Sequence, residues 1–440
     1  MKIRILAGAL LLSSVLARAE TVKDREGAVR KDRAAMENDA RWIYNDIDRG
    51  FAQARKSRKP LLVVLRCVPC KACMGIDSAV LVESSLQPLL DKFVCVRVIN
   101  ANALDLSRFQ FDYDLSFSTL FFNSDGTLYG RYGSWAHHKE EQRATTDGYR
   151  KALERVLALH RDYPLTRSSL ASKQPRPTPF KSPLEIPALA GKYQRELDWQ
   201  GKVVQSCVHC HQIGDALRAA RRAERAPMPL DLVYPMPPPE TVGLVLGADA
   251  ISHVNEVTPG SAAQRAGFQA GDDILSLDGA PLVSIADMAW ALHRAPDETT
   301  ILKALVKRGR REMSLELHLD AGWRMKSDIS RRVGTWGMRG MAAGGLVLAD
   351  VTDEERLRRG IPLEQLALKI TMVGQYGSHA AAKKAGFQKD DVIVGLGDFR
   401  SRMSEGEMLG RVLLRWFPGD SAPAQVLRGT ERIALTLPIQ

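Results

Sequence analysis

Beyond its N-terminus the sequence has no apolar run long enough to cross a bilayer, so we expect no transmembrane segment. It has no His-Glu-x-x-His pattern and no Ser/His/Asp arrangement of a known hydrolase, which argues against a protease. Its basic residues are spread along the chain without interleaved aromatic residues, so no nucleic-acid partner is expected. At 440 residues the chain is long enough for several domains, each with its own core.

Residues 1–19 have the features of an export signal. A basic stretch at 1–4 precedes an apolar stretch at 5–16, and a small-x-small cleavage site follows at 17–19. Loss of this signal lowers the formal net charge from +11 to +8, and the remaining basicity favours solubility and attraction to anionic partners. No cysteine follows closely, so no lipid anchor is expected. We therefore expect a periplasmic or secreted mature chain.

Cysteine is scarce and unevenly placed. The chain has six cysteines, and five of them form two tight clusters, which is not the spacing of a disulfide-stapled small domain. In an oxidising compartment this pattern indicates two reactive sites. The first contains Cys67, Cys70 and Cys73, and the second contains Cys207 and Cys210. The remaining cysteine, Cys95, lies in a run of valines and is expected in a core.

The first cluster follows an apolar run at 61–66, which predicts a buried strand. The turn Cys67-Val-Pro-Cys70-Lys71 comes next, before a helical pattern. At a helix N-terminus the unsatisfied N–H groups favour a thiolate, and Arg66 adds a positive charge beside it. We therefore predict that Cys67 attacks a disulfide and that Cys70 resolves the mixed disulfide. A structural disulfide and a zinc half-site are the alternatives.

This strand, Cys-x-Pro-Cys turn and helix resemble the active-site region of the thioredoxin fold, an α/β domain that we place at 37–163. On this plan we expect the following elements: a helix at 42–56, a helical stretch at 85–92, a strand at 93–99, a hairpin at 118–133 and a closing helix at 140–161. The enzyme class that the resemblance implies is thiol–disulfide oxidoreductase.

Two features depart from the thioredoxin pattern. Ser118 stands where the family has a cis-proline that faces the cysteines, and the strand before Cys67 carries no acidic residue. Loss of the proline opens the site to a metal ion. Cys73 lies one helical turn beyond the pair and is then a candidate third thiolate ligand for copper or zinc. The alternative for Cys73 is an ordinary buried cysteine in the core. The adjacent His137 and His138 are either further metal ligands or solvated loop residues.

Prolines and basic residues mark 164–187 as an extended, semi-rigid connector. The following segment, 188–240, is expected to be short and helical around Cys207-Val-His-Cys210-His211. Cys-x-x-Cys-His is the attachment motif of c-type haem. A structural disulfide and a Cys/Cys/His zinc site are the alternatives. Four arginines of this segment share one helical face, which we expect to be solvated: Arg218, Arg221, Arg222 and Arg225.

The resemblance of this segment to cytochromes c implies a set of haem c ligands. Cys207 and Cys210 would hold the macrocycle, and His211 would be the proximal ligand of the iron. The proline-flanked Met236 is the predicted distal ligand, with Met228 as its rival. His209 lies inside the motif and is not expected to reach the opposite face of the haem.

Residues 241–320 resemble a bacterial PDZ domain, an α+β fold. The resemblance rests on the turn Gly243-Leu244-Val245-Leu246 and on the pattern at 257–279, followed by a helix at 284–293 and strands at 302–306 and 313–319. In PDZ domains this turn offers N–H groups to the carboxylate of a peptide C-terminus, and the peptide adds to the sheet as a strand. The turn is therefore predicted to bind protein or peptide partners.

The PDZ pattern returns near the end of the chain. Ala266-Gly-Phe-Gln is repeated at 385–388, and Arg308-Gly309 is repeated at 428–429, which predicts a second PDZ-like domain at 361–440. Its nearest equivalent of the binding turn is at 360–363, where Pro362 removes one N–H donor. Residues 321–360 form a bridging segment without an assignment.

The whole arrangement resembles the multidomain thioredoxin–PDZ proteins of secreting bacteria. We predict an exported thiol–disulfide redox or electron-transfer protein that carries haem c and recruits partners through its PDZ domains. The first alternative is a periplasmic copper-handling protein that uses Cys67, Cys70 and Cys73. The second alternative is a PDZ scaffold whose cysteines form structural disulfides.

Overall fold

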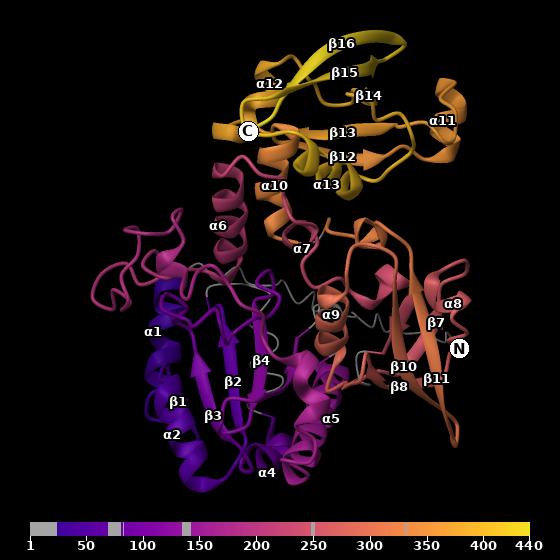
Figure 1. Cartoon of the computed structure of the whole chain (residues 1–440). Coiled ribbons are helices and arrows are strands. Elements are labelled where there is room, and N and C mark those ends of the chain that lie inside the picture. The colour runs from indigo at the N-terminus through magenta and orange to yellow at the C-terminus, as the bar shows by residue number, and fades with distance from the viewer. Residues whose placement is uncertain (1–23, 69–80, 82, 134–141, 248–250, 331) are drawn as a thin grey trace, which may run out of the picture.

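The computed structural model describes residues 24–68, 81, 83–133, 142–247, 251–330 and 332–440 (Figure 1). Five of the predicted features lie outside the described residues: the export signal, Cys70, Cys73, His137 and His138. No helix of the described residues is both long and apolar enough to span a membrane.

The first domain is built on a five-stranded mixed sheet with strand order β1-β3-β2-β4-β5. Its strands are β1 (Trp42–Tyr44), β2 (Leu61–Arg66), β3 (Val94–Val98), β4 (Phe117–Phe122) and β5 (Leu128–Tyr132). The central strand β2 runs parallel to β3 and antiparallel to β4. Every residue of β2 is buried, as its unbroken apolar run predicts.

Helices cover this sheet on both sides (Figure 1). They are α1 (Arg25–Met36), α2 (Ile47–Ser57), the short η3 (Ser84–Leu86) with α4 (Gln87–Leu90), and α5 (Gln142–Arg161). The predicted helix at 42–56 is wrong at its start, because residues 42–44 pair with β3 as an edge strand. The helix begins only after Asp46, whose carboxylate accepts a hydrogen bond from the Arg49 N–H as an N-cap.

The proline-rich stretch 164–187 is not an extended connector. It folds into η5 (Ser168–Lys173) and η6 (Pro183–Glu185), and it buries Leu170, Lys173 and Ile186 completely or nearly so. Gln174 also accepts from and donates to the backbone of Leu128 at the start of β5. The segment therefore packs as part of the first domain. The following chain contains α6 (Cys210–Ala223) and α7 (Leu230–Val233).

The second domain has the elements that its sequence predicts. After η7 (Pro239–Val242), β6 (Leu244–Leu246) pairs with β7 (Val254–Val257), and α8 (Ala262–Arg265) follows. A sheet of order β11-β10-β8-β9 is made of β8 (Asp272–Leu277), β9 (Ala280–Pro281), β10 (Thr300–Arg308) and β11 (Arg311–Leu319). The predicted helix is α9 (Ile285–Arg294), which Ser284 caps.

The C-terminal unit begins earlier than predicted. Its sheet, of order β12-β13-β14-β15-β16, starts at β12 (Leu346–Asp350) and not at residue 361. The other strands are β13 (Leu368–Val373), β14 (Val392–Leu396), β15 (Ser421–Arg428) and β16 (Glu431–Pro438). Its helices are α11 (Asp353–Arg359), the short η9 (Gly377–Ala380), α12 (Ala381–Lys384) and α13 (Glu405–Arg415). The predicted bridging segment 321–360 therefore splits between this unit and a preceding part, which contains η8 (Trp323–Lys326) and α10 (Gly334–Ala343).

The equivalent of the glycine turn in the C-terminal unit was also wrongly placed at 360–363. Gly345-Leu346-Val347-Leu348 repeats the earlier Gly243-Leu-Val-Leu sequence, and both stretches enter the first strand of their unit. The two units share a further network. Arg308 pairs with Asp272 at 2.7 Å (Nε to Oδ1), and Arg428 pairs with Asp391 at 2.8 Å (Nε to Oδ1) in the same positions.

We expect Gly345→Ala to destabilise the C-terminal unit. Gly345 has a φ of +88°, and a Cβ there would lie 2.1 Å from the backbone oxygen of His379. Gly429 is a matched control, because its φ is +64° and nothing lies within 4 Å of its Cβ position. Gly429→Ala should cost about 1–2 kcal/mol for the left-handed backbone, whereas Gly345→Ala should cost about 1–3 kcal/mol more for the clash. Denaturant unfolding measures both variants, and equal costs would contradict this account.

The first two domains meet through a buried polar contact. The Arg131 N–H of β5 donates to Asp287 Oδ1 at 2.9 Å, and Ser284 Oγ donates to the Arg131 carbonyl at 2.6 Å. Lys173 Nζ lies 2.7 Å from Asp287 Oδ2, and both side chains are 1% exposed. The N-terminal end of α9 therefore covers the free edge of the first sheet.

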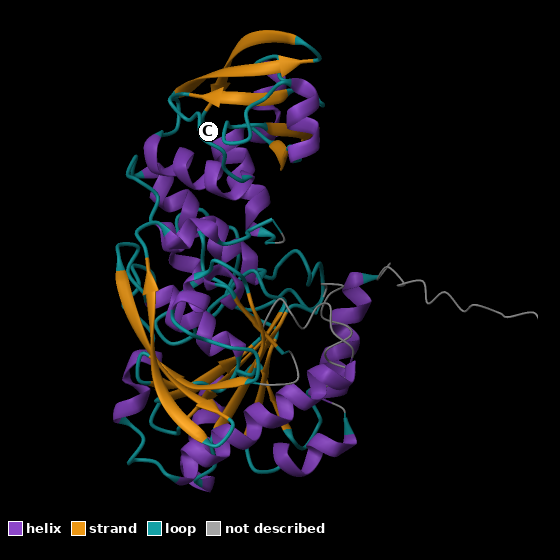
Figure 2. Cartoon of the chain, turned by 90° about the vertical axis from the view of Figure 1, so that its right-hand side faces the viewer, coloured by secondary structure: helices purple, strands orange, loops and turns teal. Residues whose placement is uncertain are grey.

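Helices join these domains to the C-terminal unit. Figure 2 shows a helical layer between the strands of the C-terminal unit and the two lower sheets. α6 belongs to this layer, and its Arg222 donates to the carbonyls of Trp416 and Gln440 at 2.6 and 2.8 Å. Arg218 and Arg222 are only 2% and 4% exposed, so the predicted solvated face is wrong for these two arginines, whereas Arg225 is exposed as predicted. The segment that carries the second cysteine cluster is thus fixed between domains.

Candidate functional site

The two cysteine motifs meet at one edge of the first sheet. Because β2 and β3 are parallel, their carboxyl ends lie side by side, with Cys67 directly after β2 and Ile99 directly after β3. The Cys-x-x-Cys-His segment crosses this edge and enters α6 at Cys210. Asn102, which is fully buried, holds it there: its Oδ1 accepts from the Val208 N–H at 2.7 Å, and its Nδ2 donates to the Ser206 carbonyl at 2.8 Å.

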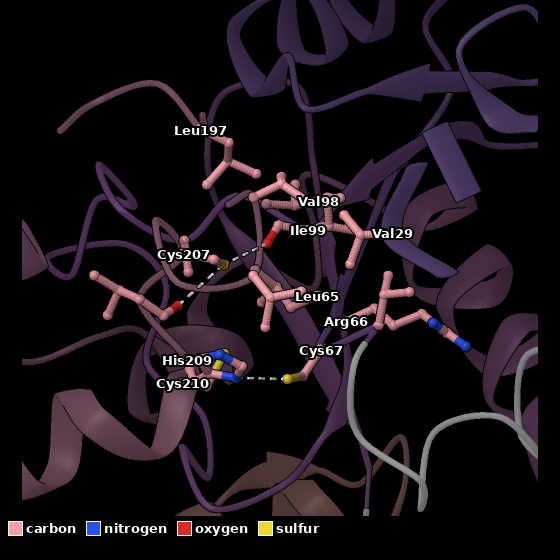
Figure 3. Close-up of a pocket in the computed structure, with 15 residues that line it drawn as sticks. Val29, Leu65, Arg66, Cys67, Val98, Ile99, Leu197, Cys207, His209 and Cys210 are labelled. Atoms are coloured by element: carbon pink, nitrogen blue, oxygen red, sulfur yellow. Dashed lines mark hydrogen bonds between the residues drawn. The ribbon is translucent and has the colours of Figure 1, made fainter. Parts of the chain in front are cut away.

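A small, mostly apolar cavity of about 20 Å³ lies between the two motifs, which is room for about one water molecule. Figure 3 shows that side chains from the ends of both strands and from the second motif point into it. Its lining includes Leu65, Cys67, Val98, Ile99, Cys207, His209 and Cys210.

His209 is the residue that joins the two motifs. Its Nδ1 lies 3.2 Å from the Sγ of Cys67, which is within hydrogen-bond reach for sulfur (Figure 3). Burial lowers the pKa of His209, and the nearby His211 lowers it further. A hydrogen bond to the Val204 backbone opposes both effects. The imidazole is therefore neutral near pH 7, and with its other nitrogen turned to a carbonyl, Nδ1 is free to accept the thiol proton.

Cys207 is a partly buried thiol and Cys210 is a buried thiol, with no disulfide between them. Cys207 Sγ donates weakly to the carbonyls of Ile99 and Val208 at 3.5 and 3.6 Å, and Cys210 packs among the apolar residues of the sheet face. Burial raises the pKa of Cys207 to about 11 and that of Cys210 to about 12. Neither thiol ionises at neutral pH without a base beside it.

The described residues do not accommodate a haem macrocycle. The two cysteines line a cavity with room for one water, whereas Met236 lines a separate cavity together with Trp290 and His293. The rival ligand, Met228, is fully buried in the core of the C-terminal unit. His211 is partly exposed, with its ring centroid 5.8 Å from that of His209. We therefore do not assign a haem to these cysteines.

The residue opposite Cys67 differs from the predicted one. β4 begins at Phe117, so Ser118 is the second residue of this strand and pairs with Leu65. Ser116 directly precedes the strand, and its carbonyl accepts from the Cys67 N–H at 3.0 Å. Ser116 therefore faces the reactive cysteine. Cys95 is 1% exposed in the sheet core, as predicted.

No metal site is found among the described residues, where no group of three or more His, Cys, Asp or Glu side chains is placed to hold an ion. The predicted thiolate set includes Cys70 and Cys73, which lie outside the described ranges. Copper or zinc binding at Cys67 and these two residues therefore stays a prediction.

The predicted peptide-binding turn enters β6 as expected, but one of its backbone N–H groups already donates to a carbonyl of the chain. Gly243 has a φ of +89°, and its N–H donates to the Glu240 carbonyl at 3.0 Å. Leu244 and Leu246 are buried, and Val245 is partly exposed.

In the C-terminal unit the Leu348 N–H of the edge strand β12 donates to Glu405 at 2.8 Å, and Glu405 is also paired with Arg339. That edge is therefore closed by the chain itself at Leu348.

Two site residues were missed from the sequence. His209 was considered only as a haem ligand, and Asn102 was not considered at all. Only the topology of the fold could have indicated these two residues. A segment that returns to the carboxyl ends of β2 and β3 brings its side chains close to Cys67. No local motif marks either residue.

Comparisons with known proteins support two of the domains. Residues 42–124 match the thioredoxin-like family model, and residues 253–305 match the PDZ domain model. The chain is 31% identical over 188 residues to the periplasmic pH-dependent serine endoprotease DegQ of Escherichia coli (strain K12). That match covers 42% of this chain and 35% of the relative, so the chain spans about a third of the relative's length. The chain therefore contains a thioredoxin-like domain and a PDZ domain.

A likeness to one solved structure is weak. An HtrA-type protease with decapeptide matches 22% of this chain and 27% of its own chain, at 21% identity and with a TM-score of 0.19. At this TM-score the likeness carries no argument about the fold or the function of this chain.

Proposed function

We propose that this protein is an exported thiol–disulfide exchange protein whose attacking thiol is Cys67. The observation that carries this proposal is the 3.2 Å contact between Cys67 Sγ and His209 Nδ1. A neutral imidazole beside a thiol is the usual means of activating a cysteine nucleophile at neutral pH. The position of Cys67 after the central strand of a thioredoxin-like domain supports the same chemistry.

In the proposed reaction His209 Nδ1 accepts the Cys67 proton, and the resulting thiolate attacks one sulfur of a client disulfide. A bond forms between Cys67 Sγ and that sulfur, the client S–S bond breaks, and the second client sulfur leaves as a thiolate that takes up a proton. Cys70 is the predicted resolving thiol. The same steps in reverse oxidise a client dithiol.

Export and partner recruitment complete the proposal. The signal at 1–19 and the likeness to a periplasmic relative support a periplasmic or secreted location. The PDZ domain at 241–320 recruits protein or peptide partners through the turn at Gly243–Leu246. The C-terminal unit, which repeats the PDZ element order, does not take a peptide at β12, because Glu405 occupies the Leu348 N–H.

The test is the reaction of the mature protein with oxidised glutathione. We expect a glutathione adduct on Cys67, found by peptide mass spectrometry when Cys70 is replaced by serine and Cys210 by alanine, so that neither thiol can resolve the adduct. The adduct should disappear in Cys67→Ser and persist in Cys95→Ser, whose residue lies in the sheet core away from the cavity. Absence of an adduct at Cys67 over the range of glutathione potentials would overturn the proposal.

The two alternatives have tests of their own. Stoichiometric uptake of Cu(I) or Zn²⁺ that requires Cys67, Cys70 and Cys73 would favour metal handling. Disulfides among the clustered cysteines that resist reduction under native conditions would favour the scaffold.

A further inference from the structure

We infer that Cys210 resolves the mixed disulfide at Cys67 and that Cys207 then forms a disulfide with Cys210. The Cys207/Cys210 dithiol thereby supplies the two electrons that reduce the client disulfide. This inference rests on the proposed function. It gives the second cysteine cluster a redox role that does not involve haem.

The geometry places all three thiols around one cavity. Cys67, Cys207 and Cys210 all line the space at the carboxyl ends of β2 and β3. Cys210 belongs to the apolar cluster that contains Leu65, two residues before Cys67. Cys207 packs against the cluster that contains Val68, the residue after Cys67. The second pair therefore lies across this cavity from Cys67, where a mixed disulfide would form (Figure 3).

The cavity between the two motifs is small. Room for one water leaves no space for a client segment or another thiol to reach the inner side of Cys67. Among the described residues, Cys207 and Cys210 are the other thiols that line this side of Cys67. Asn102 fixes the backbone of the second motif beside this cavity. Arg222 holds α6, the helix that carries Cys210, against the C-terminal unit.

His209 serves both thiols because of its place in the chain. It precedes Cys210 directly, and its ring contacts Cys67. The buried Cys210 thiol needs a base to ionise, and the neutral imidazole of the preceding residue becomes available once Cys67 is bonded to a client sulfur. Burial of Cys210 and the raised pKa of both thiols disfavour their direct reaction with external disulfides.

The transfer balances without an added reagent. The Cys210 thiol gives its proton to His209 and attacks Cys67 Sγ, the bond from Cys67 to the client breaks, and the client thiolate leaves with that proton. Cys207 then attacks Cys210 Sγ, which forms the 207–210 disulfide and returns Cys67 as a thiol. The client disulfide gains two electrons and two protons, and the Cys207/Cys210 dithiol loses them.

The test uses one equivalent of an aromatic disulfide that releases a coloured thiol. In the mature protein with Cys70→Ser and Cys73→Ser, we expect two equivalents of coloured thiol, one from attack by Cys67 and one from resolution by Cys210. Mass spectrometry should find the 207–210 disulfide. Adding Cys207→Ala should stop the reaction at a Cys67–Cys210 disulfide, and adding Cys210→Ala should leave one equivalent of aromatic thiol bound to Cys67.

Cys95→Ser in the same background is the matched control and should still release two equivalents. Alanine is used at 207 and 210 because both sites are largely apolar, and melting curves show whether each variant folds. A stable aromatic adduct on Cys67 with both buried thiols intact would overturn the inference but support the proposed function. No adduct and no release would overturn the proposed function itself.

Discussion

His209→Gln is expected to slow mixed-disulfide formation at Cys67 about 10²-fold at pH 7, the lower range for loss of a general base. Glutamine is polar and of similar size, but it does not take up a proton. The wild-type imidazole accepts the thiol proton at Nδ1, 3.2 Å from Cys67 Sγ, so the variant depends on the small fraction of thiol that ionises in water. Stopped-flow measurement of adduct formation gives the rate.

The pH dependence of that rate separates catalysis from packing. The pKa of His209 lies below its usual value, so the wild-type rate should hold at neutral pH and fall only as the pH drops through this lowered pKa, where the protonated ring no longer accepts. The variant should lack this step. His211→Gln is the control: it should keep the rate at neutral pH and keep the step, which moves to higher pH because His211 no longer lowers the pKa of His209. An unchanged rate in His209→Gln would contradict the role assigned to the ring.

Arg332→Met is expected to destabilise the protein by about 3–5 kcal/mol at pH 7, the usual cost of breaking a buried ion pair. Arg332 is 3% exposed, and its guanidinium lies 2.8 Å from Asp112 Oδ1 and 3.5 Å from Asp114 Oδ2. It also donates to the Met236 carbonyl at 2.9 Å. Methionine fills the space but leaves two buried carboxylates with like charge. Denaturant unfolding measures the loss, and the control Arg358→Met, at an exposed pair with Glu354, should cost less than about 1 kcal/mol.

The cost of Arg332→Met should depend on pH. Burial already raises the pKa of Asp112, and Arg332 opposes this rise, so removal of the arginine raises that pKa further. A carboxyl group whose folded pKa exceeds its unfolded pKa favours the folded state at low pH and loses this advantage as the pH rises through the folded value. The variant should therefore approach the wild type at acid pH. A deficit that stays constant with pH would contradict this electrostatic explanation.

Local patterns predicted the elements of the first two domains well. The apolar run 61–66 is a central strand, and the helix after Ser284 and its flanking strands occur where their spacing placed them. The strand at 42–44 was missed because three residues carry no periodicity, and only pairing with β3 makes them a strand. The repeated Gly-Leu-Val-Leu at 345–348 was readable in the sequence but was overlooked in favour of a glycine closer to the other repeats.

The site itself could be predicted only in part. Cys67 follows from its strand and turn, but its partner His209 is 142 residues away along the chain, and no periodicity connects them. The arrangement depends on how 164–187 packs and on Asn102, which fixes the second motif at the sheet edge. The Cys-x-x-Cys-His spacing alone fits haem, zinc and thiol chemistry equally, and only the surrounding packing distinguishes them.

The most direct test is the chemical state of Cys207 and Cys210 in the mature protein, made in a host that attaches haem to exported cytochromes c. Intact mass, peptide mapping and haem staining after denaturing electrophoresis measure it together. We predict a chain without added haem mass, in which both cysteines are recovered as thiols or as a disulfide with each other. A haem band that stays with the polypeptide, joined to Cys207 and Cys210 by thioether bonds, would contradict a thiol role for this pair.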